Sequence, residues 1–236
     1  MQLAIFDLDN TLLGGDSDDL WGEFLVAQGV VDRDWYAAEN RRHYEAYEAG
    51  TLDIQAFLGF ALKPLADNNP QDLKRWREQF LRDYIEPILL PAADTLLAAH
   101  RAAGDQLLII TATNSFITAP IAERLGVENL LATEPEQHNG RYTGRVSGTP
   151  CFQAGKVTRL QHWLAQQGSA DTAGVDSIFY SDSHNDLPLL RQATRAVAVD
   201  PDPVLTEEAS RQGWPIITLR DGNQPRHRDN GEPWHP

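Results

Sequence analysis

The chain has 236 residues, of which 42% are hydrophobic and 23% charged, an ordinary composition for a globular protein with one large core or two modest ones. Its formal net charge of −14 argues against binding to nucleic acid or to an anionic membrane, and no apolar run approaches the roughly 20 residues of a membrane span. The single cysteine, Cys151, excludes an internal disulfide and, with no signal-peptide pattern at the start of the chain, predicts a cytoplasmic protein.

An apolar stretch of strand type that starts at Leu3 runs directly into Asp7 and Asp9, which are followed by a turn-like Asn10-Thr11 step. Residues two apart on a strand point the same way, so we expect both carboxylates to face one site at the carboxyl end of the strand. Open α/β sheets bind their ligands at that edge, and a divalent cation commonly holds two such charges together. The segment therefore predicts metal-assisted chemistry.

The stretch from about residue 16 to residue 84 is predicted to be helical, because its aromatic and aliphatic residues recur with the i, i+3, i+4 spacing of helices. It is too long for a simple crossover between two strands. We therefore interpret residues 15–88 as an inserted helical domain, called the cap below, that lies beside the carboxyl edge of a sheet.

Strands and helices alternate after the prolines at positions 87 and 91. Helices are expected at 92–103, from the polar run 111–115 to 125, at 156–167 and at 205–212, and strands at 106–110, 130–133, 177–181, 196–199 and 216–219, with a hairpin turn at Asn139-Gly140. This order predicts an α/β fold, with a Rossmann-like parallel sheet core that has helices on both faces, formed by residues 1–14 and 89–222. The polar residues 223–236 are predicted to form a disordered tail.

Further along the chain, four polar side chains fall at predicted strand ends or helix starts: Thr111, Lys156, Asp182 and Asp186. Each alone has an ordinary interpretation as a helix cap, a solvated lysine or part of an acidic turn. Their order and their common position at one sheet edge favour a joint site with the two aspartates of the first strand.

Together these residues resemble the four motifs of the haloacid dehalogenase superfamily, and within it those of the phosphoserine-phosphatase-like branch: Asp7-Leu8-Asp9-Asn10-Thr11, Thr111, Lys156 and Asp182-Ser183-His184-Asn185-Asp186. The resemblance spans roughly residues 3–219 and includes the cap. It implies a phosphomonoesterase that depends on Mg²⁺ and works through an aspartyl-phosphate intermediate.

The resemblance also implies roles for the carboxylates. Asp7 would be the nucleophile, and Asp9 would protonate the leaving alkoxide and later activate water. Mg²⁺ would be bound by the Asp7 carboxylate, the backbone carbonyl of Asp9 and Asp182, since this ion prefers oxygen ligands.

The remaining motif residues are expected to bind phosphate or to support the site. Thr111, Ala112 and Lys156 would bind the phosphoryl oxygens, whose charge must be stabilised in the transition state. Asn185 would orient these groups, and Asp186 would either support the metal site or hold Lys156. His184 departs from the small residues common at its position, and we expect it to be a loop histidine outside the chemistry.

The substrate is expected to be a small phosphorylated metabolite, because a cap would cover the site. Asp16 stands where the resemblance places an acidic residue that receives the ammonium group of phosphoserine. The cap arginine that would receive its carboxylate has no counterpart, since Gly59 falls there and the nearest cation is Lys63. An unpaired carboxylate is costly to bury, so we favour an amino alcohol, with histidinol phosphate as the first choice and phosphoserine as the alternative.

Two aromatic cap residues, Phe57 and Phe60, either pack the imidazole of such a substrate or belong to the cap's own core. A phosphotransferase or mutase on the same scaffold stays open as an alternative. A non-enzymatic phospho-accepting signalling module is disfavoured, because its acidic pair precedes the phosphate acceptor, whereas here the acceptor lies on the first strand and an acidic pair comes last. The oligomeric state is left open between monomer and homodimer.

Overall fold

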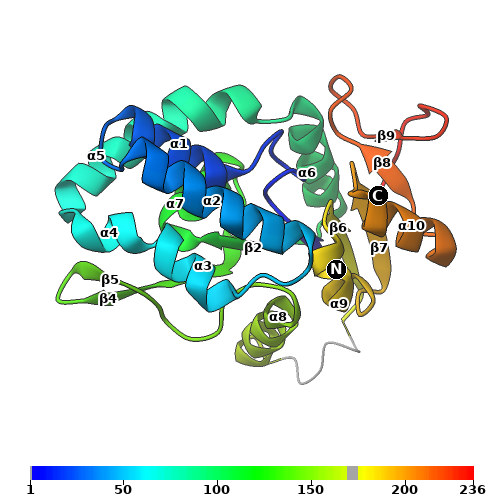
Figure 1. Cartoon of the computed structure of the whole chain (residues 1–236). Helices are drawn as coiled ribbons and strands as arrows, with labels where there is room; N and C mark the ends of the chain where they lie inside the picture. Colours follow the sequence, from blue (N-terminus) through cyan, green and yellow to red (C-terminus); the bar gives the residue numbers. More distant parts are fainter. Residues whose placement is uncertain (1, 169–174) are drawn as a thin grey trace.

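The computed structural model describes residues 2–168 and 175–236, and its centre is a seven-stranded sheet with the order β3-β2-β1-β6-β7-β8-β9 (Figure 1). The strands are β1 Leu3–Phe6, β2 Gln106–Asn114, β3 Asn129–Thr133, β6 Ser177–Ser181, β7 Arg195–Val199, β8 Ile216–Thr218 and β9 Arg226–His227. All neighbours run parallel except β9, which is antiparallel to β8. The chain builds outward from β1 in one direction and from β6 in the other, and such a reversal of strand order opens a ligand crevice at the carboxyl ends of the strands.

Both faces of this sheet are buried, which explains why its strands read as continuous apolar runs. Ala4 and Phe6 of β1 point to one hydrophobic cluster, and Leu3 and Ile5 point to the other. The first cluster includes residues of α6 (Pro91–Ala103) and α7 (Ser115–Arg124), and the second includes residues of α8 (Ala154–Gln166), α9 (Leu187–Leu190) and α10 (Pro203–Gln212). The predicted α/β fold, with helices on both faces of a parallel sheet, is confirmed.

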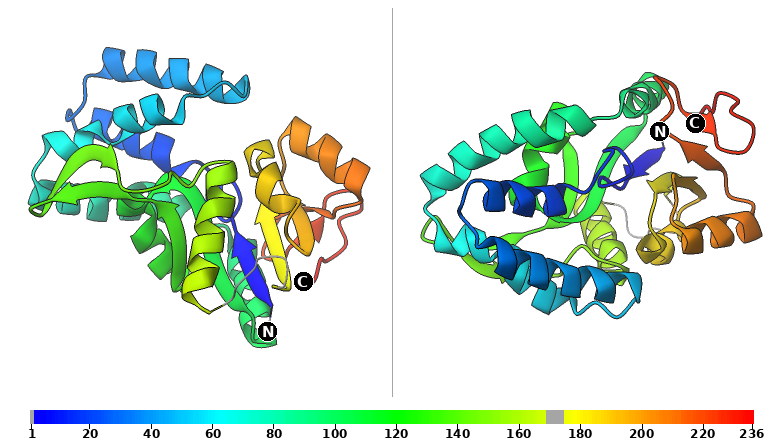
Figure 2. Two further views of the ribbon diagram at one scale, coloured as in Figure 1. Left: turned by 90° about the horizontal axis from the view of Figure 1, so that it is seen from below. Right: turned by 45° about the horizontal axis from the view of Figure 1, so that its top comes forward.

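The stretch between β1 and α6 is helical, as its periodicity predicts. It contains α1 Ser17–Ala27, α2 Arg33–Glu48, α3 Ile54–Ala61, α4 Lys63–Asp67, α5 Pro70–Phe80, η1 Leu81–Ile85 and η2 Glu86–Ile88. Figure 2 shows α1 to α5 grouped together on one side of the sheet. Across the described ranges 2–168 and 175–236, no helix has the length and apolar character needed to cross a bilayer.

A hairpin of β4 (Pro135–His138) and β5 (Arg141–Val146) forms a separate two-stranded sheet. Its turn is the predicted Asn139-Gly140 pair, and both residues have the positive φ that a two-residue hairpin turn requires. The hairpin packs against α3 and α4, and a Cβ on Gly144 would lie 3.3 Å from the Cβ of Ala66. The hairpin, which belongs to the predicted core, therefore contacts the cap.

The prediction of a disordered tail at residues 223–236 is wrong. This segment adds β9 to the edge of the sheet, and the backbone N–H of Trp234 donates to the carbonyl of Pro225 at 2.9 Å. The Trp234 side chain is 7% exposed and meets the ring of Tyr180 edge-on, with 5.5 Å between ring centroids. One buried tryptophan supplies the apolar area that the polar composition of the segment conceals.

Candidate active site

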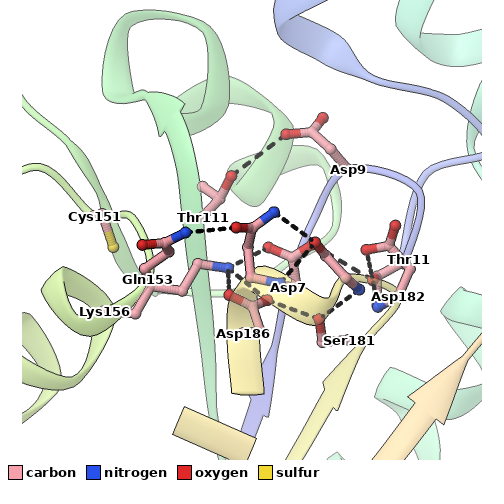
Figure 3. Close-up of polar contacts among 12 residues, drawn as sticks. Asp7, Asp9, Thr11, Thr111, Cys151, Gln153, Lys156, Ser181, Asp182 and Asp186 are labelled. Atoms are coloured by element: carbon pink, nitrogen blue, oxygen red, sulfur yellow. Dashed lines mark hydrogen bonds and ion pairs between the residues drawn. The ribbon is translucent and has the colours of Figure 1, made fainter. Parts of the chain in front are cut away.

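Neither aspartate belongs to the strand, which corrects the sequence-based expectation, because Asp7 directly follows β1 and Asp9 lies in the turn after it. β1 ends at Phe6, and Asn10 has a φ of 57°, a left-handed conformation that asparagine tolerates better than most residues. The two carboxylates consequently point to different sides of the site, with Asp7 facing Lys156 and Asp9 facing Thr111 (Figure 3). Both still lie at the carboxyl end of β1, as predicted.

Lys156 is the cation at the centre of the site. Its Nζ lies 2.8 Å from Asp7 Oδ1 and 2.8 Å from Asp186, and the residue is only 3% exposed. Burial by itself lowers the pKa of Lys156, but attraction to Asp186 and Asp7 outweighs it and raises the pKa, so the ammonium group stays charged. Two roles were considered for Asp186, and the 2.8 Å contact corresponds to the second of them, holding Lys156.

Asp182 is joined to the first turn through Thr11. The Thr11 hydroxyl donates to Asp182 Oδ1 at 3.1 Å and accepts from the Asp182 backbone N–H at 3.1 Å. Ser181, the last residue of β6, donates its hydroxyl to Asp186 at 2.7 Å. These short links fix the loop after β6 against the loop after β1.

Negative charge exceeds positive charge among these groups, because three carboxylates, Asp7, Asp182 and Asp186, stand against one lysine that pairs with Asp7 and Asp186. Burial raises the pKa of Asp7 to about 7 although Lys156 opposes it, and burial together with repulsion from Asp7 and Asp186 raises the pKa of Asp182. Such an excess of carboxylate fits a divalent cation. Among the residues that the structure describes, no three His, Cys, Asp or Glu side chains are grouped so that they could hold a metal ion. The predicted Mg²⁺ site does not require three such side chains, because it uses two carboxylates and one backbone carbonyl.

Asp9 is held by hydroxyl groups of β2 and by the start of α1. Its Oδ2 accepts from Thr113 at 2.8 Å and from Thr111 at 3.4 Å, and its Oδ1 accepts from the backbone N–H of Ser17 at 2.7 Å. β2 can present these threonines because its register with β3 shifts between Ile110 and Asn114. A local break in pairing next to a site commonly re-aims side chains in this way.

Ala112 lies between Thr111 and Thr113 in this irregular segment and is half-buried, whereas both threonines are buried. The sequence predicts that this strand ends at residue 110, whereas it continues to Asn114. The predicted phosphate-binding residues Thr111 and Ala112 therefore lie within β2, near its end, and the Thr111 hydroxyl is beside the Asp9 carboxylate.

Asn185 is positioned by Gln153, a residue that the sequence did not single out. Gln153 Nε2 donates to Asn185 Oδ1 at 2.7 Å, directly before the helix that carries Lys156. Gln153 has φ 49° and ψ −122°, a backbone conformation that costs a non-glycine residue on the order of 1–3 kcal/mol. Nearby, a Cβ on Gly155 would lie 2.1 Å from the carbonyl oxygen of Pro150, so only glycine fits there.

Exchanging Gln153 for glycine is expected to separate stability from activity. A Gln153→Gly variant relieves the backbone strain but removes the amide that orients Asn185, so we expect unchanged or higher thermal stability and a roughly tenfold lower kcat, the usual scale for a supporting hydrogen bond. Gln153→Ala, which removes the amide and keeps the strain, serves as the control and should lose both. Thermal unfolding and steady-state phosphate release measure the two effects, and wild-type kcat in the glycine variant would contradict this role.

The acidic residue expected to meet a substrate ammonium group, Asp16, caps α1 by accepting from the backbone N–H groups of Asp18 and Asp19. Asp16 itself is exposed to solvent. Desolvation by the neighbouring protein atoms, together with repulsion from Asp9 and Asp18, raises its pKa. Burial and repulsion from Asp9 and Asp19 also raise the pKa of Asp18, to about 7. A cationic ligand group would relieve this repulsion.

Other predicted cap residues lie away from these contacts. Lys63 pairs with Asp67 at 2.6 Å on the surface, and more than half of each side chain is exposed. Phe57 and Phe60 pack their rings on His43, with centroids 5.5 and 5.3 Å away. Of the two roles considered for these phenylalanines, the structure displays the core role.

His184 lies in the loop after β6, within the last quoted motif, and Asp202 fixes its orientation. Its Nδ1 is 2.8 Å from Asp202 Oδ2, which also accepts the His184 backbone N–H at 2.7 Å. The same aspartate caps α10 by accepting from Leu205. Cys151 is buried, and burial raises the pKa of its thiol to about 12, which leaves it unreactive.

Five residues at the site were not assigned roles from sequence: Thr11, Tyr47, Thr113, Gln153 and Ser181. Thr11 lies within the first quoted motif, and Thr113 lies two residues after Thr111. A hydroxyl residue so close to a motif residue was the signal that could have identified each of them. Nothing in the sequence marks Gln153, because a left-handed glutamine follows no pattern. Tyr47 comes from the cap and meets Ser183 across 136 positions of the chain.

Comparison with known proteins identifies the family to which a chain with this fold and this site belongs. Residues 4–191 match the haloacid dehalogenase-like hydrolase family, and the chain belongs to this family. A histidinol-phosphatase of Neisseria meningitidis serogroup C is 44% identical over 219 residues, which cover 92% of this chain and 99% of that protein. The predicted enzyme class, a phosphoric monoester hydrolase of this superfamily, is confirmed.

Solved structures agree on the fold. A protein with unknown function from Bordetella pertussis is 47% identical, with a TM-score of 0.87 over 92% of this chain and 98% of that one. A substrate-bound phosphoserine phosphatase is 18% identical, with a TM-score of 0.65 over 88% of this chain and 90% of that one. At that level of identity, the second likeness shows a shared fold.

Proposed function

We propose that this protein hydrolyses histidinol phosphate to histidinol and phosphate. The reaction type rests on one observation above all: Lys156 holds the Asp7 carboxylate at 2.8 Å, at the carboxyl end of β1, with Asp9 beside it. The substrate is supported by the identity to the Neisseria enzyme along nearly the full length of both chains. The repelling carboxylates at Asp16 and Asp18, which favour a cationic substrate, support it further.

In the proposed reaction Asp7 attacks phosphorus while the bond from phosphorus to the ester oxygen breaks. Asp9 gives its proton to the departing alkoxide, which leaves as the alcohol. Asp9 then takes a proton from a water molecule that attacks phosphorus of the aspartyl-phosphate, and phosphate and free Asp7 are released. Thr113, at 2.8 Å from the Asp9 carboxylate, keeps this side chain turned toward Thr111 and the phosphoryl site.

Phosphate binding is assigned to Thr111, Ala112 and Lys156, with Asn185 orienting the loop opposite. The charged Lys156 side chain faces Asp7, so it is placed to stabilise charge on phosphoryl oxygens as the bond to Asp7 forms. Its second partner, Asp186, keeps the ammonium group in place between turnovers.

Mg²⁺ would be held by Asp7, the backbone carbonyl of Asp9 and Asp182. When bound, the ion neutralises part of the carboxylate excess and part of the phosphate charge, which is the usual contribution of Mg²⁺ to phosphoryl transfer. Thr11 keeps Asp182 turned toward Asp7 through its 3.1 Å hydrogen bond.

Residues 15–88 are proposed to act as the cap that covers this site and excludes water from it. Asp16 at the start of the cap would receive the substrate's ammonium group. Phosphoserine is the second candidate because of one cap residue, Arg77. Its guanidinium lies 4.7 Å from the centre of the Phe116 ring and donates from Nη1 to the Phe116 carbonyl at 2.9 Å, whereas its buried Nε has no hydrogen-bond partner among the described residues and so has an N–H left for an acceptor such as a carboxylate.

Phosphate release from a panel of small phosphomonoesters tests the proposal. With Mg²⁺ present we expect kcat/KM for histidinol phosphate to exceed that for phosphoserine by about tenfold or more, because the phosphoserine carboxylate would lack a cationic partner. A chelator should abolish release, and an added alcohol acceptor should leave the phosphate yield unchanged, which separates hydrolysis from transfer. An advantage for phosphoserine that disappears in Arg77→Met would establish the second candidate and overturn the first.

A further inference from the structure

Tyr47 connects the cap to the loop that carries Asp182 and Asp186. It lies near the end of α2, and its hydroxyl is 2.8 Å from Ser183 Oγ. Ser183 Oγ in turn accepts from the backbone N–H of Asn185 at 3.2 Å. A cap residue therefore contacts the same short loop that holds the predicted metal ligand and the partner of Lys156.

Three aromatic rings meet at this contact, and we call Tyr47, Phe152 and His184 the aromatic corner. The Tyr47 ring lies 6.5 Å from that of Phe152, tilted by 41°, and 6.3 Å from that of His184, tilted by 52°. These separations are at the long end of direct aromatic contact. All three residues are half-buried, so each keeps part of its surface open.

Each member of the aromatic corner is adjacent to the reaction centre. Phe152 precedes Gln153 at the start of the Lys156 helix, and His184 is next to Ser183 and held by Asp202. Burial raises the pKa of Tyr47 to about 12, hydrogen bonding with Ser183 and Asn185 opposes this, and the charges of Asp182 and Asp7 add to it. The phenol is thus within electrostatic range of the proposed nucleophile.

The aromatic corner contrasts with the ring cluster first considered for the substrate. Phe60 stacks on His43 and Phe57 meets it edge-on, and since His43 is itself buried, both rings pack within the cap. The aromatic corner, in contrast, joins the cap to the core beside the carboxylates. Tyr47 meets the loop that carries Asp186, and Asp186 pairs with the same lysine as Asp7.

We propose that the aromatic corner is the specificity subsite for a planar, weakly basic heteroaromatic ring on the substrate, with Tyr47 as its specificity-determining residue. The proposal rests on the proposed function and extends it by assigning the group that recognises the ring. Flat rings add to aromatic contacts by stacking or by edge-to-face packing, and the neighbouring carboxylates favour a ring that can carry a proton. A substrate without a ring would gain nothing from Tyr47.

Two variants of Tyr47 separate the ring from the hydroxyl. Tyr47→Leu should lower kcat/KM for histidinol phosphate by about tenfold, chiefly through KM, and leave kcat/KM for phosphoethanolamine within about twofold, because only the first substrate has a ring. Tyr47→Phe should retain most activity toward both. Tyr44→Leu, at an exposed tyrosine of the same helix, is the matched control and should behave as wild type. Equal losses on both substrates in Tyr47→Leu would overturn the proposal and leave Tyr47 a purely structural contact.

Inhibition by histidinol gives a second measurement that does not depend on histidinol phosphate being the substrate. With p-nitrophenyl phosphate as the reporter, histidinol should inhibit the wild-type protein, and its inhibition constant should rise about tenfold in Tyr47→Leu. If histidinol phosphate is not hydrolysed but this shift is seen, the proposed function fails and the aromatic corner stands. An inhibition constant that does not change, or no inhibition of the wild-type protein, would refute the aromatic corner.

Discussion

An Asp7→Asn variant is expected to lose phosphatase activity by about 10⁴-fold or more while folding at least as stably as the wild-type protein. The amide cannot attack phosphorus, so the proposed covalent step is blocked. At the same time the substitution removes one of three neighbouring carboxylates, Asp7, Asp182 and Asp186, and burial already raises the pKa of Asp7 to about 7, which means that its charged form is disfavoured where it lies.

Phosphate release and thermal unfolding without Mg²⁺ measure the two halves of this prediction. Asp34→Asn, at an exposed position on α2, is the matched control and should change neither quantity. Retained activity in Asp7→Asn would remove Asp7 from the chemistry. A marked loss of stability would contradict the charge imbalance inferred for the site.

Lys156→Met is expected to destabilise the protein by about 3–5 kcal/mol at neutral pH, because it leaves buried carboxylates without their cation. The penalty should shrink as the pH falls. Burial holds the pKa values of Asp7 and Asp182 above those of the unfolded chain, so the folded variant binds more protons than the unfolded one, and its stability falls as the pH rises. This loss of stability begins near the ordinary pKa of a carboxyl group and continues as the pH rises through the raised pKa values of Asp7 and Asp182.

Urea unfolding between pH 5 and pH 8 measures this dependence, with Lys74→Met as the control at an exposed surface lysine. Added Mg²⁺ should restore part of the lost stability in Lys156→Met, since a cation can replace the missing charge. A penalty that is independent of both pH and Mg²⁺ would contradict the electrostatic interpretation and leave only lost packing.

Much of the fold follows from local patterns. The strands of the sheet are buried on both faces, so their apolar runs stand out from the helices between them, and the parallel register aligns Phe6 with Ile109 and Tyr180. That register is why residues just after β1 and β6 and residues near the end of β2 meet at one edge. The length of the helical stretch after β1 was enough to predict an insertion without any knowledge of its packing.

The failures come from contacts that no local pattern encodes. The polar tail is ordered because Trp234 packs against Tyr180, 54 positions away by sequence numbering. Gln153 adopts a backbone conformation typical of glycine, held in place by its bond to Asn185. Lys156 and Asp7 were brought together by a recognisable order of motifs, whereas Tyr47 and Ser183, almost equally distant in sequence, had no motif to connect them.

Covalent attachment of phosphate to Asp7 is tested most directly by acid-quenched mass spectrometry of an Asp9→Asn variant mixed with p-nitrophenyl phosphate and Mg²⁺. The nitrophenolate leaves without a proton from Asp9, whereas activation of water requires that residue, so the intermediate should accumulate. We predict a phosphoryl adduct on the peptide that contains Asp7, absent when Asp7 is also replaced by asparagine. An adduct on another residue, or nitrophenolate release at the wild-type rate from the double variant, would contradict Asp7 as the nucleophile.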